Sequence, residues 1–472
     1  MIYLIIFFGF IFRLISINQS LWLDEATSAL VAKMSVADIF SKFLPGDFHP
    51  SLYYLFLKGW VALFGMGEVA LRIPSVIFGV ATIYATYLVA AKLFNRRVGL
   101  ISSSLMATSG LAVYYSQEAR MYSLAAFLVG FLVYLFLEKK WIYFSVILLL
   151  LGMTDYVSLF IIPVFWITGW NDRKKLTFSH VPLAVTFIIW LPIFIKQLVV
   201  GSAVKTSWLQ LLGMATFKNT LLIPVKFMIG RISFDDKTLY AVLVGLISSL
   251  FGYLLFRAMK LPNLIVGVSS PSASSGAESL RNETTSLHPR AYVRGISRRG
   301  IKDSKLLWAW LITPILIGII VSLKIPTLSY FRFLFVLPAF YILIAKAIGN
   351  LGKHRKLFLC LVLGVNLIST MYYLLTPRFQ REDWRGAAYA LGADKIEFPA
   401  ATQKEALIYY GKGEQIINPS QITPKDKEIW LSRYVWEIFD SEDSARQSVE
   451  SLGYNKTSEY NFNGVVLWRY TK

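Results

Sequence analysis

Long apolar stretches, separated by short polar gaps, recur along most of the chain. A helix needs roughly 17–25 apolar residues to cross a bilayer, and we expect such crossings at residues 1–17, 71–93, 98–114, 121–137, 141–153, 156–170, 180–199, 238–257, 306–323, 331–349 and 357–375. Transmembrane strands would show short alternating segments instead, and the sequence has none. The pattern predicts an α-helical polytopic membrane protein with about eleven transmembrane helices.

The gaps differ in charge, and this difference predicts the orientation in the membrane. Lys and Arg gather in the gaps at 96–97, 139–140, 173–175, 257–305 and 353–356. Cytoplasmic loops carry an excess of these residues, so we place all five gaps inside. An odd number of crossings then predicts a multi-pass protein of the plasma membrane with a cytoplasmic N-terminus and an extracytoplasmic C-terminus. The first stretch lacks a basic start and a small-residue cleavage signature, which predicts a retained helix.

Three segments do not fit a simple series of crossings. Residues 50–66 are apolar, but counting them as a crossing would put Arg96 and Arg97 outside, so we interpret them as an outer juxtamembrane or re-entrant helix. We interpret residues 205–230 in the same way. Residues 258–305 are rich in Ser, Gly and Arg, which predicts a flexible basic cytoplasmic loop.

The composition changes after residue 375. The transmembrane domain is expected to cover 1–375, and 376–472 to form a small α/β extracytoplasmic domain. Strand-like runs in this tail are ALIYY, EIWLSRY and GVVLWRY, and helix-like runs are WRGAAYALG and SEDSARQSVESLG.

Composition supports the membrane class. Of 472 residues, 56% are hydrophobic and 16% are charged, whereas a soluble chain carries about a quarter charged residues. The net charge of +20 would suggest nucleic acid in a soluble protein. Here the cytoplasmic gaps account for it, so we expect no nucleic-acid partner. The single cysteine, Cys360, excludes an intramolecular disulfide.

Four polar clusters lie at the predicted outer membrane interface. They contain Asp24 and Glu25 in SLWLDEATSAL, Asp47 and His49 in GDFHP, Glu118, Arg120 and Tyr122 in YYSQEARMYS, and Tyr330 and Arg332 in SYFRF. Taken singly, each has an ordinary explanation: solvated acids, a helix cap, a snorkelling arginine or tyrosines of the aromatic belt. The basic gaps alone placed all four at one level, which favours a common site.

This set of residues suits group transfer from a lipid phosphate. A carboxylate at the interface can take a proton from an acceptor hydroxyl, and Arg and His can hold a phosphodiester. Fixed cations stabilise the negative charge that grows on a departing phosphate. Because phosphate is a good leaving group, one base could be enough.

The motifs LWLDEA, DFHPSLYY, GEVALRIPS, FNRRVGL and YYSQEARMY, in this order, resemble the GT-C superfamily of integral membrane glycosyltransferases. The nearest group is that of the protein O-mannosyltransferases and of the aminoarabinose transferase that modifies lipid A. The resemblance covers roughly residues 1–140, and YFRFLFVLPAF and REDWRGAA also fit.

The resemblance implies an inverting enzyme on the outer face that takes its sugar from a polyprenyl phosphate, undecaprenyl or dolichyl. It implies a carboxylate base in the first outer loop, mapped to Asp24 with Glu25 beside it. Residues implied to lie near the donor phosphate are His49, Arg120, Tyr122, Tyr330 and Arg332, and Asp47 and Glu118 are candidates for substrate contact. A second Asp-x-Asp motif is missing, which argues against transfer of a large preassembled glycan.

Several alternatives stay open at this stage. A divalent cation could be held by the acidic and histidine side chains of the outer loops, which are Asp24, Glu25, Asp47, His49 and Glu118. The resemblance implies no metal, however, and we predict no cofactor. The acceptor could be a protein, a lipid or a glycan, as in protein glycosylation or lipopolysaccharide modification, and the donor sugar is open. A transporter or flippase of lipid-linked sugars, or a non-catalytic envelope scaffold, are the competing hypotheses.

Overall fold

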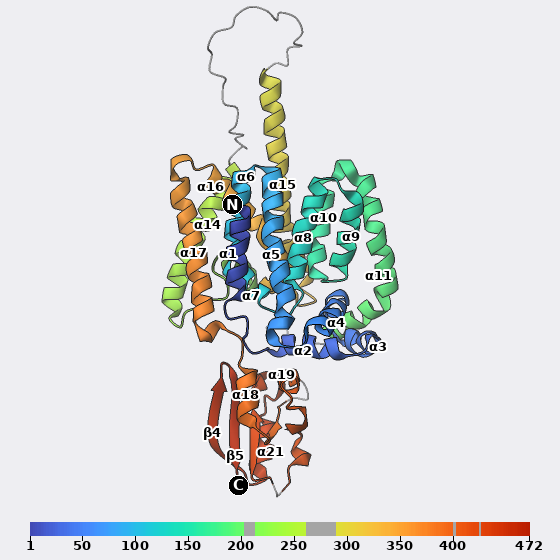
Figure 1. Ribbon diagram of the computed structural model, residues 1–472, viewed down its shortest axis with the longest axis vertical. Helices are drawn as coiled ribbons and strands as arrows, with labels where there is room; N and C mark the ends of the chain where they lie inside the picture. The colour runs from blue at the N-terminus through green and yellow to red at the C-terminus, as the bar shows by residue number, and fades with distance from the viewer. Residues whose placement is uncertain (203–212, 261–288, 400–402, 424–425) are drawn as a thin grey trace, which may run out of the picture.

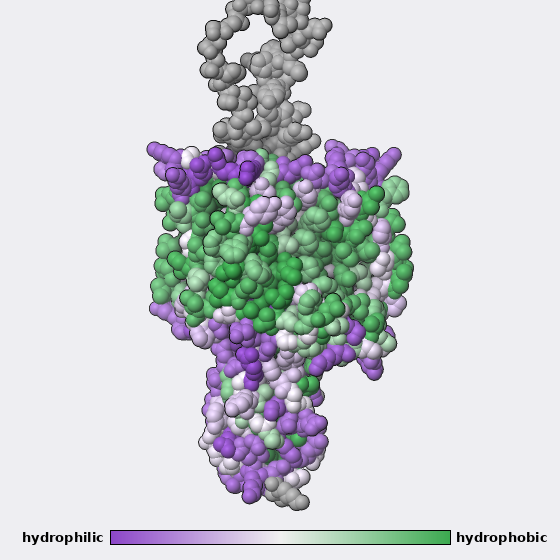
Figure 2. Space-filling model, in the orientation of Figure 1, coloured by the Kyte–Doolittle hydropathy of each residue, from purple (hydrophilic) through white to green (hydrophobic). Residues whose placement is uncertain are grey.

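The computed structural model describes residues 1–202, 213–260, 289–399, 403–423 and 426–472. These residues form a layer of roughly parallel helices with a small sheet-containing domain attached at one end (Figure 1). On the face shown in Figure 2, a broad band of hydrophobic residues covers the helical layer between two hydrophilic rims. An apolar belt of this kind is what a bilayer solvates, so the chain is a multi-pass membrane protein.

The helices of the layer match the apolar stretches of the sequence. They are α1 (Ile2–Leu14), α5 (Glu68–Leu93), α6 (Arg96–Ala107), α7 (Gly110–Ser116), α8 (Tyr122–Leu137), α9 (Trp141–Gly152), α10 (Ile162–Thr168) after the 3-10 turn η3 (Val157–Ile161), α11 (Arg173–Ser202), α13 (Phe217–Ile229), α14 (Lys237–Lys260), α15 (Pro289–Val321), α16 (Leu337–Gly349) after the 3-10 turn η5 (Tyr330–Val336), and α17 (Arg355–Leu375).

Length separates these helices into two groups. Within the described residues, six helices are long and apolar enough to cross a membrane, and the bent pair α6 and α7 would be a seventh. Shorter apolar helices include α1, α8, α9 and the η3–α10 unit, which run alongside the long ones (Figure 1). The predicted number of about eleven crossings depends on these four, and it stays a prediction.

The segment interpreted as a juxtamembrane helix lies at the end of the layer that carries the C-terminal domain. Helices α2 (Leu23–Lys33), α3 (Val36–Asp38) and α4 (Leu52–Phe64) all gather there (Figure 1). The second such segment, 205–230, is described only from residue 213 and contains α13.

The predicted loop 258–305 is shorter than expected. Residues 261–288 lie outside the described part of the chain, but α15 already begins at Pro289. An α-helix satisfies its own backbone hydrogen bonds, so it need not end where its apolar stretch ends. The sequence prediction of a linker as far as residue 305 was therefore wrong for its last part.

The C-terminal domain is α/β, as predicted. Its sheet has the order β2-β1-β3-β5-β4, with parallel pairing of β1 to β2 and β3 and antiparallel pairing of β5 to β3 and β4. The elements are α18 (Trp384–Leu391), β1 (Lys395–Glu397), α19 (Glu405–Tyr409), β2 (Ile416–Ile417), β3 (Glu428–Ser432), α20 (Trp436–Phe439), α21 (Ser444–Ser451), β4 (Asn455–Phe462) and β5 (Val465–Thr471). The predicted strand at ALIYY is wrong, since this run forms α19.

Packing against the membrane domain explains that exception. Ala406 and Leu407 of α19 are fully buried, and α19 lies against α2. The hydroxyl of Tyr409 donates to the Met66 carbonyl at 2.5 Å, and the Leu21 amide donates to the hydroxyl of Tyr410 at 2.8 Å. Tertiary contacts of this kind override the weak strand preference of a short apolar run.

Candidate active site

Asp24 and Glu25 are neighbours in the first turn of α2, but their side chains have different surroundings. The Asp24 side chain is 39% exposed, and one of its oxygens lies 3.7 Å from Nη2 of Arg120. Glu25 is fully buried and pairs with Arg72 of α5 at 2.5 Å. Consecutive helical residues point about 100° apart, so only Asp24 faces an accessible space.

Glu25 and Arg72 form a closed network. Glu25 accepts two hydrogen bonds from Arg72 and one from the Ala119 amide. Arg72 also donates to the carbonyls of Ile17, Gln19 and Ser20 at 2.6–2.9 Å. Burial would raise the pKa of Glu25, but Arg72 outweighs it and lowers the pKa. Glu25, predicted as a catalytic candidate, is thus engaged in holding the loop after α1 against α5 and the loop before α8.

Arg120 connects Asp24 to the second polar cluster. Its side chain is buried, and Nη1 donates to the hydroxyl of Tyr54 at 3.4 Å. Tyr54 donates to Asp47 at 2.7 Å, and Nδ1 of His49 lies 3.6 Å from the same carboxylate. Burial would raise the pKa of Asp47, but His49, Arg120 and Tyr54 together lower it to about 2. Residues predicted from three separate motifs therefore form one electrostatic chain.

Asp24 borders a polar cavity of about 200 Å³. Of the predicted site residues, Glu118, Tyr122 and Tyr330 line it as well. The remaining lining residues are Trp22, Tyr114, Tyr115, Arg231, Phe331, Gln380, Arg381 and Glu382. We call this space the polar cavity.

Two arginines that line the polar cavity, Arg231 and Arg381, were not predicted from the sequence. Arg231 follows α13, and its guanidinium bonds to the hydroxyl of Tyr114 and lies 4.4 Å from the centre of that ring. Gly230 makes this placement possible: it has φ +66°, and a Cβ there would lie 3.1 Å from the backbone of Gly110 and Leu111. A single arginine at the end of an apolar helix was the only signal in the sequence.

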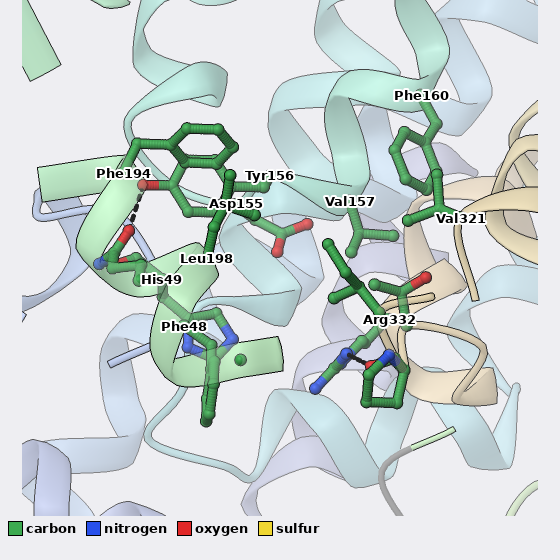
Figure 3. Close-up of a pocket in the computed structure, with 15 residues that line it drawn as sticks. Phe48, His49, Asp155, Tyr156, Val157, Phe160, Phe194, Leu198, Val321 and Arg332 are labelled. Carbon is green, nitrogen blue, oxygen red and sulfur yellow. Dashed lines mark hydrogen bonds between the residues drawn. The ribbon is translucent and has the colours of Figure 1, made fainter. Parts of the chain in front are cut away.

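A second, largely apolar cavity of about 200 Å³ lies beside the first and is drawn in Figure 3. His49 and Arg332, both predicted phosphate ligands, line it together with Phe48, Val157, Phe160 and Phe194. Nη1 of Arg332 donates to the Pro326 carbonyl at 2.7 Å. We call this space the apolar cavity.

Asp155 also lines the apolar cavity and was missed in the sequence. It lies in the short gap between α9 and η3, where one of its oxygens accepts from the Ser158 amide at 2.8 Å. The signal was present, because an acidic residue between two apolar stretches is uncommon and invites a functional interpretation.

The turn η5 separates the two cavities. Tyr330 and Phe331 line the polar one, whereas the next residue, Arg332, lines the apolar one. A ligand with an apolar chain and a polar head could therefore lie across this turn, with its charged junction near Arg332 and His49. The arrangement suits an amphipathic phosphodiester.

Within the described residues, no group of three or more His, Cys, Asp or Glu side chains is placed to hold a metal ion. Asp47 and His49 lie together, whereas Glu25 is held by Arg72. Independence from metal stays a prediction.

The fold is that of solved integral membrane glycosyltransferases. ArnT from Cupriavidus metallidurans bound to undecaprenyl phosphate matches over 99% of this chain and 96% of that chain, with a TM-score of 0.50 and 11% identity. Its apo state matches with the same values. The apo oligosaccharyltransferase from Archaeoglobus fulgidus matches over 89% of this chain and 65% of that chain, with a TM-score of 0.47 and 13% identity.

A match in sequence covers part of the chain. Residues 48–199 match the family model of dolichyl-phosphate-mannose-protein mannosyltransferases. No curated protein sequence matches the chain. The fold and this segment together confirm the resemblance to GT-C glycosyltransferases that the motifs indicated.

Proposed function

We propose that this chain is an inverting glycosyltransferase that moves a sugar from a polyprenyl phosphate to an acceptor on the outer face of the membrane. The observation that carries the proposal is the position of Asp24: a half-exposed carboxylate at the edge of a polar cavity, beside an apolar cavity that holds His49 and Arg332. The match to the mannosyltransferase family model supports the same chemistry.

The donor would lie across η5. Its polyprenyl chain would occupy the apolar cavity, whose phenylalanines and aliphatic side chains suit a hydrocarbon. Its phosphate would meet His49 and Arg332 at the cavity edge, with Arg120, Tyr122 and Tyr330 nearby. Undecaprenyl phosphate is bound in the ArnT structure of the same fold, which makes a carrier of this class the natural choice.

Transfer would proceed in one displacement. The acceptor oxygen attacks the anomeric carbon from the face opposite to the phosphate, and Asp24 takes the hydroxyl proton. The bond between the anomeric carbon and the phosphate oxygen breaks, and the phosphate leaves with the electron pair. Attack from the opposite face inverts the anomeric centre. The fixed cations stabilise the charge that develops on the leaving phosphate, and Arg120, 3.7 Å from Asp24, orients the base.

We place this site on the outer face of the plasma membrane. The basic gaps 96–97, 139–140 and 353–356 lie at the opposite end of the helical layer (Figure 1), and a cytoplasmic location for them follows the positive-inside tendency. The C-terminal domain then lies outside, next to the side from which a protein, lipid or glycan acceptor would approach.

Replacement of the base tests the proposal. Asp24→Asn should lower sugar transfer from an undecaprenyl-phosphate-linked donor in liposomes by about 10²–10⁴-fold and leave donor binding in place. Asp38→Asn is the matched control, because Asp38 lies at the same end of the molecule but, among the residues that the structure describes, pairs only with Ser35 and Lys42 on the surface. Full transfer by the Asp24 variant would remove Asp24 as the base. Movement of the lipid across the bilayer without sugar transfer would favour the flippase.

A further inference from the structure

Arg381 reaches the polar cavity from outside the membrane domain. It lies in the segment that connects α17 to α18, and its side chain is only 2% exposed. Its guanidinium lies 3.7 Å from the centre of the Tyr114 ring, and Nη2 lies 2.9 Å from Oε2 of Glu118. The backbone amide of Arg381 donates to Gln19 at 2.8 Å, which fixes the position of the segment.

The Arg381–Glu118 pair is poorly satisfied for a buried ion pair. Among the described residues, Nε and Nη1 of Arg381 have no hydrogen-bond partner, and neither carboxylate oxygen of Glu118 makes a well-aligned hydrogen bond. Arg72, buried to the same degree nearby, uses all of its guanidinium nitrogens. An unsatisfied buried polar group is destabilising, so a set of them around one cavity indicates a ligand-binding site.

Attachment of the C-terminal domain does not explain this arrangement. Arg385 pairs with Glu68 at 3.2 Å, and Tyr409 and Tyr410 bond to the loops before α2 and α5. These contacts already attach the domain to the membrane domain at its surface. A purely structural arginine at position 381 would have partners for its remaining nitrogens.

The lining of the polar cavity indicates the chemical class of the ligand. Arg381 and Arg231 supply hydrogen-bond donors, Glu118, Glu382 and Asp24 supply acceptors, and the walls are aromatic. A phosphate alone fits less well, because its oxygens accept hydrogen bonds and cannot donate to the carboxyl oxygens of the lining. A sugar ring fits better, because each hydroxyl both donates and accepts and its carbon–hydrogen face packs on aromatic rings.

We infer that the polar cavity binds the sugar ring of the lipid-linked donor, and that Arg381 and Glu118 hold its hydroxyls. This inference rests on the proposed function and adds a new element to it. The segment leading into the C-terminal domain supplies part of the sugar site, so the domain is required for donor recognition. Burial and the nearby Glu25 and Asp24 raise the pKa of Glu118, which lets its carboxyl group act as a donor as well as an acceptor.

The test compares two probes on the full-length protein in detergent. The first is undecaprenyl phosphate, and the second is a panel of undecaprenyl phosphates carrying mannose, glucose or aminoarabinose. Arg381→Gln should weaken binding of the preferred sugar-bearing lipid by tenfold or more and leave the affinity for undecaprenyl phosphate within twofold. Arg385→Gln, in the first turn of α18, is the matched control and should change neither affinity.

Two further variants distinguish a selective loss of sugar binding from misfolding. Arg381→Lys keeps the charge, and Glu118→Gln removes the partner without altering the connecting segment; both should show the same selective loss. Equal weakening of both probes, or no weakening of either, would overturn the inference. If the wild type transfers a sugar while Arg381→Gln binds that donor normally, the inference fails and the proposed function stands. If the wild type binds undecaprenyl phosphate but neither binds nor transfers any of the three sugars, both are overturned.

Discussion

Substitution of the buried pair Glu25–Arg72 tests whether Glu25 stabilises the fold while its neighbour Asp24 acts as the base. Glu25→Gln keeps the shape of the side chain and an oxygen for the Ala119 amide, but it removes the charge. Arg72 would then be a buried cation without a charged partner among the described hydrogen bonds, which go to the carbonyls of Ile17, Gln19 and Ser20. We therefore expect Glu25→Gln to lower the free energy of unfolding rather than to remove a catalytic group.

The magnitude follows from the contacts. Breaking a buried ion pair by removing one partner costs about 3–5 kcal/mol. Because Gln retains part of the hydrogen bonding, we expect about 3 kcal/mol for Glu25→Gln. Asp24→Asn, one residue away and half exposed, should change stability by less than about 0.5 kcal/mol. Denaturant-induced unfolding in detergent micelles, followed by tryptophan fluorescence, measures both.

A double variant strengthens the test. Glu25→Leu combined with Arg72→Met removes both charges, and it should be less destabilising than either single change because no uncompensated charge remains. If Glu25→Gln unfolds at the same denaturant concentration as Asp24→Asn, the structural role given to Glu25 is wrong. Loss of transfer by Glu25→Gln in a protein of unchanged stability would return Glu25 to the list of catalytic residues.

Two further predictions concern stability in other parts of the molecule. Burial, with Asp440 nearby, raises the pKa of Glu397 in β1 to about 7, above its ordinary 4.5; the C-terminal domain should thus lose about 1–2 kcal/mol as pH rises from 4.5 to 7. Glu397→Gln should abolish this slope when thermal unfolding is compared at pH 5 and pH 8, and an unchanged slope would contradict the assignment. In the membrane domain, a Cβ at Gly79 would lie 2.0 Å from Oγ of Ser116, so Gly79→Ala should cost about 1–3 kcal/mol. Gly245→Ala meets nothing within 4 Å and should be neutral or slightly stabilising in the same unfolding assay.

Much of the architecture could be predicted because it depends on composition and period. A bilayer requires continuous apolar helices, and this requirement appears directly in the sequence as long apolar stretches. The observed bounds of α5, α8, α14 and α17 lie within a few residues of the predicted ones. The C-terminal domain was predicted less well, since the run at ALIYY is a helix whose conformation depends on its contact with α2.

Some residues of the candidate site could be predicted from the sequence, and others became apparent only in the structure. Asp24, Asp47 and Arg120 were found from their motifs, because each lies within two positions of another charged residue or a histidine. Arg231 and Arg381 were not, because each is a single arginine whose partner, Tyr114 or Glu118, lies more than a hundred positions away. The histidine and arginine that line the same cavity as Asp155, His49 and Arg332, are also more than a hundred positions from it in the sequence. Only folding brings such residues to one cavity.

The Asp24-Glu25 pair shows most clearly what each level decides. The sequence alone determined that two adjacent acids lie at a polar cluster beyond the first apolar stretch, and the motif favoured Asp24 as the base. It carried no information on which carboxylate would be neutralised, because the neutralising cation, Arg72, comes from α5. The tertiary structure decided this by burying Glu25 against Arg72 and leaving Asp24 at the cavity. A buried charge requires a fixed partner, and only the packed fold selects that partner.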